Sequence, residues 1–299
     1  MNKAEHFKSG FVAVVGRPNV GKSTMINALI GDKIAIVSDK AQTTRNRIIC
    51  VYTDEEKQIV FMDTPGVHKP KHKLGEFMVD AAIESLKETE AVLFVVAGNE
   101  KRGPGDNFII EQLKRVKVPV FLVVNKIDTL QKEQVLEAIV SYQDAYPFAG
   151  VIPISAKNKE NLSELLNVLG EHLPEGPQYF LEDMITDQPE RLIISDIVRE
   201  KILLSTRDEI PHAIAVDVDE MKTRDDGTTY IRATIYCERD SQKGIIIGNK
   251  GALLRKIGAE ARMDIQKLLA IKVYLDLWVK VKKDWRNKSG MLSELGYKK

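Results

Sequence analysis

Cysteine and tryptophan are scarce in this 299-residue chain, with two residues of each. Cys50 and Cys237 stand far apart and form no CxxC pair, which argues against disulfide frameworks and zinc sites and suits a reducing compartment. We expect both cysteines to be small buried residues on strands. Long apolar runs are also missing, because the purest, AVLFVVA at 91–97, is far short of the roughly 20 residues of a membrane-spanning helix.

The N-terminal stretch MNKAEHFKSG lacks the apolar region of a signal peptide and the Arg/Ser-rich character of a transit peptide. We therefore expect a cytoplasmic protein with no integral membrane segment. Peripheral contact with a membrane stays open at this point. We also expect a monomer.

Net charge is nearly absent as well, since 44 Lys and Arg oppose 43 Asp and Glu. The balance is uneven along the chain. Residues 241–299 hold 14 basic and 5 acidic residues, so residues 1–240 hold 30 and 38. An acidic body joined to a basic last fifth indicates a polyanionic partner for the basic part.

Short apolar runs alternate with helix-period segments from residue 11 to about 172. The runs FVAVV, QIVFM, AVLFVVA, VPVFLVV and VIPI are almost continuously apolar, as in strands of a parallel sheet that is covered on both faces. We predict a doubly wound α/β domain over residues 1–172. Ligands of such sheets bind beyond the carboxyl ends of the strands, which directs attention to the loops there.

A different pattern follows residue 172. Residues 173–190 contain three prolines and several acids, which predicts an interdomain linker. Residues 191–299 then read as α-β-β-α-α-β, with a hairpin around RDDG and a strictly alternating strand KVYLDLWVKVKK at 272–283. In that strand Val273 and its i+2 neighbours face one way, and Tyr274, Trp278 and the lysines face the other. The second domain is thus predicted to be α+β.

GRPNVGKS at 16–23 follows a predicted strand and opens a predicted helix, as the GxxxxGK[ST] phosphate loop requires. Two glycines let the backbone wrap a phosphate, and the N–H groups with the helix N-terminus supply positive potential. Lys22 adds a charge against the β- and γ-phosphates, and the Ser23 hydroxyl can ligate magnesium. The predicted nucleotide-binding residues of this loop are Asn19, Val20, Gly21, Lys22, Ser23 and Thr24.

DTPG at 63–66 follows the next strand. We expect Asp63 to hold magnesium and the Gly66 N–H to meet the γ-phosphate. Thr43 and Thr44 lie in a polar loop suited to a mobile switch, and we favour Thr44 as the magnesium ligand and switch contact. Lys22, Thr44 and Gly66 are the predicted catalytic groups. The next residue is Val67, whereas a hydrolase of this kind usually has a polar side chain there to orient the attacking water.

NKID and SAK, each after a predicted strand, point to guanine. The carboxylate of Asp128 can accept hydrogen bonds from both the N1–H and the exocyclic amine of guanine, and adenine offers neither donor there. We expect Asn125 to reach the base edge and Lys126 to stack on the base. In the second motif, formed by Ser155, Ala156 and Lys157, the Ala156 N–H is placed near the guanine O6.

GNKG at 248–251 lies in the basic part of the chain, after III and before a periodic helix. It resembles the signature of KH domains, which hold about four nucleotides of a single strand in an apolar groove. The order of the predicted elements is similar to the type II arrangement. The predicted nucleic-acid contacts are Ile247, Gly248, Asn249, Lys250, Gly251 and Arg255.

The ordered set GRPNVGKS, TTR, DTPG, NKID and SAK resembles the translation-factor GTPases of the Ras superfamily, and is very similar to the Era family over the whole chain. That resemblance implies a GTP-hydrolysing switch with slow intrinsic turnover, GTP or GDP and Mg²⁺ as ligands, and a KH domain that binds the 3′ end of small-subunit ribosomal RNA during assembly of the small subunit. Asn19 is similar to the loop asparagine of GTPases that coordinate K⁺. Hydrophobic residues at position 67 are also a feature of Era-like proteins.

Two alternatives stay open. One is a GTP-gated RNA-binding module with little turnover, which Val67 supports. The other is a GTPase of the tRNA-modification type, although such proteins end in a functional cysteine and this chain ends in SELGYKK.

Overall fold

The computed structural model describes residues 6–38, 40, 43–67, 70, 72–207 and 210–297. They form two compact units: the first takes most of residues 6–187, and the second takes residues 188–297 together with 36–38, 40, 43 and 72–74. Within the described residues, no helix is long and apolar enough to cross a bilayer.

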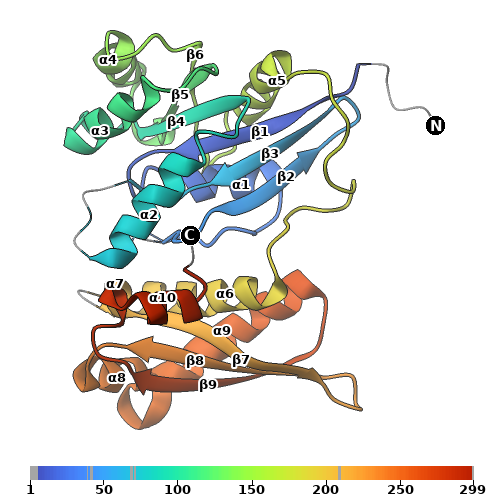
Figure 1. Ribbon diagram of the computed structural model, residues 1–299, viewed down its shortest axis with the longest axis vertical. Coiled ribbons are helices and arrows are strands. Elements are labelled where there is room, and N and C mark those ends of the chain that lie inside the picture. Colours follow the sequence, from blue (N-terminus) through green and yellow to red (C-terminus); the bar gives the residue numbers. More distant parts are fainter. Residues whose placement is uncertain are drawn as a thin grey trace. The chain divides into compact units, whose positions relative to one another are not determined.

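The first unit is built on a six-stranded sheet with the order β2-β3-β1-β4-β5-β6 (Figure 1). Five of the strands are parallel and correspond to the five predicted runs: β1 (Lys8–Val15), β3 (Lys57–Asp63), β4 (Ala91–Ala97), β5 (Val120–Asn125) and β6 (Gly150–Pro153). The edge strand β2 (Ile48–Thr53) pairs antiparallel with β3 and was missed, so the sheet is mixed. The predicted doubly wound α/β architecture is confirmed.

Helices cover both faces of this sheet (Figure 1). Val12 and Val14 of β1 face the apolar cluster that contains α1 and α5, while Ala13 and Val15 face the opposite cluster. This double burial explains the continuous apolar runs of the strands. The helices are α1 (Lys22–Ile30) and α5 (Leu162–His172) on one face, and α2 (Lys73–Glu84), α3 (Pro104–Leu113) and α4 (Lys132–Gln143) on the other.

The segment expected to be a linker follows the edge of the sheet in the first unit. The side-chain oxygen of Gln58 accepts hydrogen bonds from the N–H groups of Tyr179 and Phe180, at 2.7 and 3.0 Å. The N–H of Val51 in β2 donates to the carbonyl of Ile185 at 2.9 Å. The last contact satisfies a backbone N–H of the edge strand β2, and the first two anchor the segment to β3.

The second unit has the predicted α-β-β-α-α-β order, with two short helices added. Its elements are α6 (Glu190–Ser205), α7 (Ile210–Ala213), β7 (Ala215–Thr223), β8 (Thr229–Cys237), α8 (Asp240–Ile247), α9 (Ala252–Leu269), β9 (Val273–Val281) and α10 (Ser289–Glu294). The sheet order is β7-β8-β9; β8 pairs antiparallel with β7 and parallel with β9.

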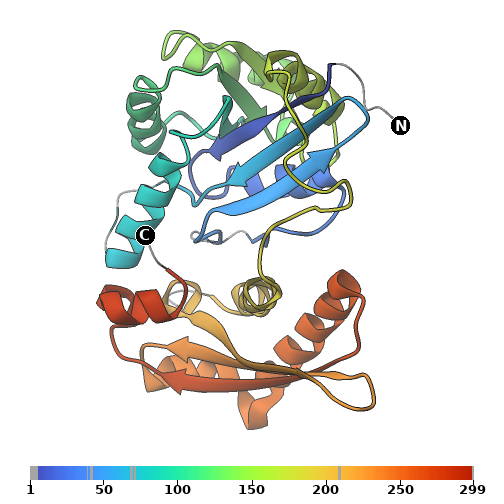
Figure 2. The ribbon, with the colours of Figure 1, turned by 45° about the vertical axis from the view of Figure 1, so that its right-hand side comes forward.

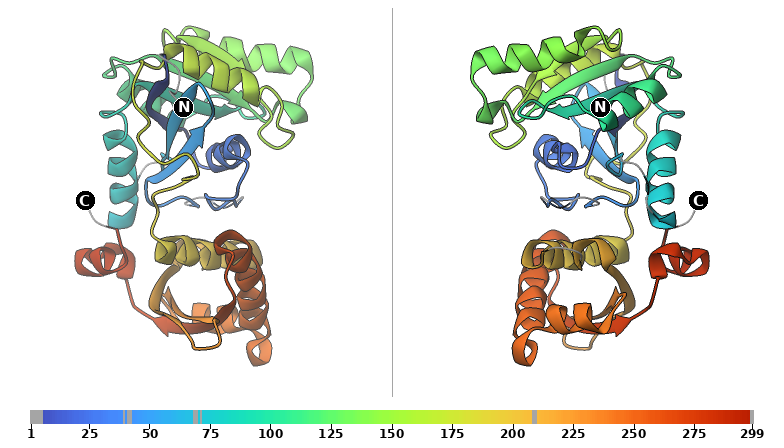
Figure 3. Two further views of the ribbon diagram at one scale, coloured as in Figure 1. Left: turned by 90° about the vertical axis from the view of Figure 1, so that its right-hand side faces the viewer. Right: turned by 90° about the vertical axis from the view of Figure 1, so that its left-hand side faces the viewer.

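Helices α6, α8 and α9 pack on one face of the three-stranded sheet (Figures 2 and 3). The predicted inward residues of β9, among them Val273 and Val279, belong to this core, and Cys237 lies in it too. On the outer face, Tyr274 and Trp278 are more than half exposed. The alternation of β9 is therefore confirmed, and so is the burial of both cysteines.

Candidate functional site

The phosphate loop joins β1 to α1, as predicted. Val20 is fully buried in the apolar cluster beneath the loop, while Asn19 is exposed with a φ of 65°. The Lys22 ammonium donates hydrogen bonds to the carbonyls of Gly16 and Arg17, both at 3.1 Å. Burial lowers the pKa of Lys22 to about 8, and nearby Asp63 opposes this only in part. The loop thus holds a buried cation whose charge a phosphate would stabilise.

The three predicted magnesium ligands converge at the carboxyl ends of the strands. The Ser23 hydroxyl donates to Asp63 Oδ2 at 2.7 Å and lies 3.0 Å from Thr44 Oγ1. The Thr44 hydroxyl also donates to Asp63 Oδ2, at 3.3 Å. All three side chains are buried. Two hydroxyls and one carboxylate form an all-oxygen set, which fits Mg²⁺ with its retained waters.

Gly66 packs directly against the phosphate loop. A Cβ at this position would lie 2.7 Å from the Pro18 backbone, so only glycine permits this approach. The N–H of the following Val67 donates to the Gly16 carbonyl at 3.1 Å. The Val67 side chain is 4% exposed and belongs to the apolar cluster that contains Met62. Its side chain therefore anchors the loop in the core instead of facing the phosphate site.

Asn125 joins the phosphate loop to the two base motifs. Its amide nitrogen donates to the Val20 carbonyl at 2.9 Å, and its amide oxygen accepts from the N–H groups of Lys126 and Ala156 at 2.8 and 3.0 Å. We expected Asn125 to reach the base edge; in the structure its amide binds these protein groups. The Asp128 carboxylate accepts from the Ser155 hydroxyl at 2.7 Å, which orients it, and the side chain stays exposed.

An ion-pair network behind these motifs was not predicted. The Arg17 guanidinium donates to Glu100 and to the fully buried Asp106, both at 2.9 Å. The other oxygen of Glu100 lies 3.8 Å from the Lys126 ammonium. Glu100 thus links the phosphate loop to the base motif. Sequence reasoning lacked a signal for this, because the two acids lie more than 80 residues from Arg17.

The remaining predicted nucleotide residues lie on the same loops. Thr24 is half-buried in the first turn of α1, and Lys157 is exposed directly after Ala156. The structure therefore gathers the nucleotide residues at one edge of the sheet.

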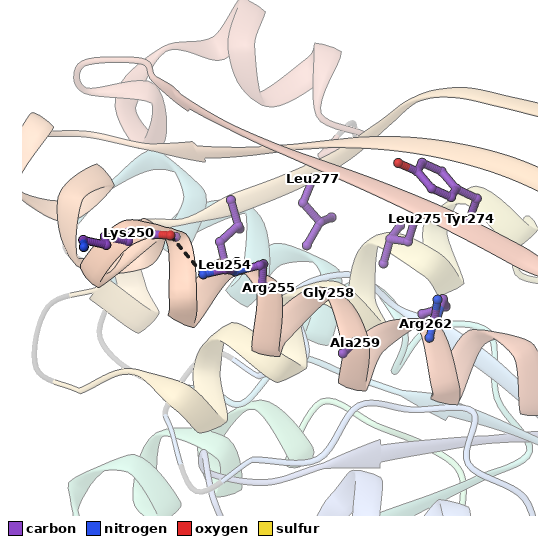
Figure 4. Close-up of a pocket in the computed structure, with 10 residues that line it drawn as sticks. Lys250, Leu254, Arg255, Gly258, Ala259, Arg262, Tyr274, Leu275 and Leu277 are labelled. Atoms are coloured by element: carbon purple, nitrogen blue, oxygen red, sulfur yellow. Dashed lines mark hydrogen bonds between the residues drawn. The ribbon is translucent and has the colours of Figure 1, made fainter.

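In the second unit, a groove of about 500 Å³ runs between α9 and the edge strand β9 (Figure 4). Its floor is apolar and its rim basic. It is lined by Lys250, Gly251, Leu254, Arg255, Gly258, Ala259, Arg262, Tyr274, Leu275 and Leu277. Three of these residues were predicted. An apolar floor with cations at the rim suits unstacked bases with their phosphates outside.

The GNKG turn forms one end of this groove. Gly248 has φ 73° and ψ −179°, and a Cβ there would lie 2.7 Å from Leu253. The 3₁₀ turn Asn249–Gly251 follows, with Lys250 also at positive φ. Arg255 donates to the Lys250 carbonyl at 3.1 Å and so ties the turn to α9 (Figure 4). Both glycines of the turn have positive φ, 73° at Gly248 and 77° at Gly251.

Three predicted contacts, Ile247, Gly248 and Asn249, are not among the residues that line the groove, and the wall formed by β9 was missed. Ile247 packs against the core of the unit and does not line the groove. On α9, Leu254, Gly258 and Arg262 lie four residues apart on one face, so helical periodicity beside the predicted Arg255 could have indicated them. Leu275 and Leu277 come from β9 and become neighbours only through the tertiary fold.

These sites define a class of protein: a GTPase with a phosphate loop, followed by a KH domain. A family model described as 50S ribosome-binding GTPase matches residues 11–126, and a KH-domain model matches residues 209–286. A crystal structure of Era in complex with MgGDPNP and nucleotides 1506–1542 of 16S ribosomal RNA is 43% identical, with a TM-score of 0.95 over 98% of this chain and 99% of that one.

A second structure, a variant of Aquifex aeolicus Era bound to GDP and AlF4⁻, is also 43% identical. Its TM-score is 0.94, over 97% of this chain and 99% of the other. The chain belongs to the Era family of GTPases.

Proposed function

We propose that this protein is a GTP-hydrolysing switch whose KH domain binds the 3′ end of small-subunit ribosomal RNA and assists assembly of the small subunit. The observation that carries this proposal is the 43% identity, over nearly the whole chain, to an Era that was crystallised with MgGDPNP and that RNA. The clustered phosphate-loop and base motifs of the first unit and the groove of the second support the proposal. A cytoplasmic location is part of the proposal, because ribosomal RNA is the partner.

The nucleotide would lie along the edge formed by the phosphate loop and the two base motifs. Lys22 would hold the β- and γ-phosphates, and Asp128 would read the guanine edge. Ser23, Thr44 and Asp63 would hold Mg²⁺, which when bound neutralises charge that develops on the phosphates. Thr44 and Gly66 would close on the γ-phosphate and be released after hydrolysis. RNA affinity measured with GDP and with a non-hydrolysable GTP analogue tests the switch, since equal affinities would remove it.

The nucleotide preference offers a sharp test. An Asp128→Asn variant loses an acceptor of the guanine N1–H and gains a donor, so it should prefer xanthine to guanine nucleotides. Hydrolysis of GTP and of XTP by the two proteins measures this, and Asp144→Asn, on an acid beyond the end of α4, serves as control. Unchanged GTP preference in Asp128→Asn would contradict the assignment.

RNA binding is tested separately. We expect a single-stranded RNA with the 16S 3′-end sequence to bind, and a scrambled RNA of equal length to bind more weakly. A double substitution of Lys250 and Arg255 by Glu should abolish this difference while leaving GDP affinity unchanged. Equal binding of the two RNAs would leave a non-specific polyanion site.

The buried Val67 favours a second candidate, a GTP-gated RNA-binding module with little turnover. Single-turnover hydrolysis with and without RNA distinguishes the two. A first-order release of phosphate that RNA accelerates supports the enzyme, and its absence in both conditions supports the module.

The exposed Asn19 supports one further proposed ligand, a K⁺ ion beside the phosphate loop. Hydrolysis should then be faster in K⁺ than in Na⁺, and Asn19→Ala should remove the difference. Equal rates in both salts would rule out the ion.

A further inference from the structure

The outer face of the KH sheet carries a cluster of aromatic and arginine side chains next to the groove. Tyr230 of β8 and Tyr274 of β9 stack with ring centroids 5.9 Å apart and planes at 20°. The guanidinium of Arg224, from the hairpin between β7 and β8, lies 5.1 Å from each ring centroid. Trp278 follows on β9 and is 54% exposed. Exposed aromatic rings at such density need a physical reason.

One carboxylate holds two of these rings, those of Tyr230 and Trp278, in place. Asp276, between Tyr274 and Trp278 on β9, accepts hydrogen bonds from the Tyr230 hydroxyl at 3.0 Å and the Trp278 indole N–H at 2.9 Å. The polar ends of Tyr230 and Trp278 are therefore satisfied within the protein. What they offer to a partner is ring surface whose orientation is already fixed, which lowers the entropy lost on binding.

The cluster is continuous with the groove. Tyr274 and Leu275 both line the groove. This is unexpected, because consecutive residues of a strand face opposite sides of the sheet. Both reach the groove because β9 is the edge strand of the sheet. A strand of RNA that leaves the groove at this end would meet Tyr274 first and then the outer face.

The charge is more negative along β7 than along β9, whose outer face carries one acid, Asp276, and one lysine, Lys280. Asp217, Asp219 and Glu220 lie on β7, at the far edge of the sheet. Glu220 forms ion pairs with Lys222 and Arg232. Beside the rings, Arg224 and Lys280 are exposed cations. Rings and arginine planes with cations beside them are what single-stranded nucleic acid stacks on.

We propose that Trp278, Tyr274 and Arg224 form a second contact surface for single-stranded RNA, which continues the strand held in the groove. The inference rests on the proposed RNA binding of the KH groove and extends it. In this arrangement the groove holds about four nucleotides, and the bases that follow stack on the outer face. The surface lengthens the RNA segment that the domain can hold.

The experiment compares two RNAs on the full-length protein. One fills the groove alone, with about four nucleotides, and the other extends the same sequence by about four nucleotides at one end or the other. Adding the nucleotides at one of the two ends, but not at the other, should increase the affinity of the RNA. Trp278→Ala should remove roughly tenfold of that gain, the effect of losing one stacked base, while Trp278→Phe should keep most of it.

The two tryptophans supply a direct readout. Trp285 is fully buried, with its indole N–H donating to the Ala213 carbonyl at 2.9 Å, whereas Trp278 is exposed. The longer RNA should quench the Trp278 emission and protect it from acrylamide, and the short RNA should do neither. Phe108→Ala, at a 44% exposed ring on α3, is the matched control and should change neither affinity nor quenching.

The outcomes separate the two proposals. Failure of the short RNA to bind overturns the groove proposal. Binding of the short RNA without gain or quenching by either extension overturns the outer-face proposal alone. A concentration-dependent dimer that Trp278→Ala abolishes would assign the outer face to a second copy of the chain. That result would also overturn the outer-face proposal. Unchanged far-ultraviolet circular dichroism of each variant excludes misfolding as the cause.

Discussion

The buried ammonium of Lys22 predicts a pH dependence of nucleotide binding. In the nucleotide-free protein its pKa is about 8, because burial penalises the charged form. Phosphates of a bound nucleotide raise the pKa again, so the nucleotide binds best to the protonated side chain. Binding must therefore take up a proton at alkaline pH, and GDP affinity must fall as the pH rises through 8.

The size of the effect follows from that pKa. With a pKa of about 8, Lys22 is about 90% protonated at pH 7 and about 10% at pH 9, so the GDP affinity should fall about tenfold over this range. Proton uptake should be about one half at pH 8. Titration calorimetry in buffers of different ionisation enthalpy measures both quantities, and GDP avoids hydrolysis during the titration.

A variant isolates the lysine from other titrating groups. The guanine N1–H also titrates at alkaline pH, and it does so equally in wild type and in Lys22→Met. The difference between the two proteins therefore reports Lys22 alone. Affinity of the wild type that changes with pH no more than that of Lys22→Met would refute the reasoning.

The same pKa has a signed consequence for stability. The folded pKa of Lys22 lies below its ordinary value of 10.5. Between these values the unfolded chain binds more protons than the nucleotide-free folded chain, so this residue makes the free energy of unfolding rise with pH from about 8. Urea unfolding of wild type and Lys22→Met should diverge in that direction, and saturating GDP should reduce the divergence.

Three further predictions follow from the geometry. Val67→Gln buries an amide in an apolar cluster and should destabilise the first unit by about 1–3 kcal/mol without raising the single-turnover rate; a large gain in rate would mean that the valine is a simple defect. Asp63→Asn removes the only carboxylate of the Ser23–Thr44–Asp63 cluster and should abolish the Mg²⁺-dependent part of nucleotide affinity, measured with and without EDTA. Gly258→Leu should fill the groove and abolish RNA binding, whereas Gly258→Ala, whose Cβ meets Leu277 at an ordinary 3.4 Å, should bind RNA and gain up to about 1 kcal/mol from helix propensity.

Much of the fold could be predicted because its signals are local. The five parallel strands are continuous apolar runs, and β9 alternates strictly, so both types of strand are visible in the sequence. The edge strand β2 was missed, although IICVYT is rich in residues that favour strands. A turn signal follows this strand in the sequence, because Asp54 comes directly after Thr53. In the structure Asp54 accepts hydrogen bonds from the N–H groups of Glu56 and Lys57, as in a turn that begins with aspartate.

The site residues, too, fall into those that local sequence motifs reveal and those that depend on the tertiary fold. The nucleotide residues lie in short motifs after strands, where topology alone brings them together. The β9 side of the groove, with Leu275 and Leu277, and the Arg17–Glu100 ion pair depend on which distant segments become neighbours, and no local pattern carries that information. Asn125 shows a third case, because its position was predicted and its hydrogen-bond partners were not.

The anchoring of Val67 gives a physical reason for an apolar residue after the DTPG motif. The Gly16 carbonyl accepts hydrogen bonds from both Lys22 and the Val67 N–H, at 3.1 Å each. With its side chain in the core, Val67 fixes Gly66 against Pro18, where a Cβ would not fit. A polar residue at 67 would either be buried without partners or leave the core, and in both cases the support of Gly66 would be weaker. Placing the attacking water therefore falls to groups outside the Val67 side chain, and the backbone of the switch segments and bound cations are the groups we expect to share it.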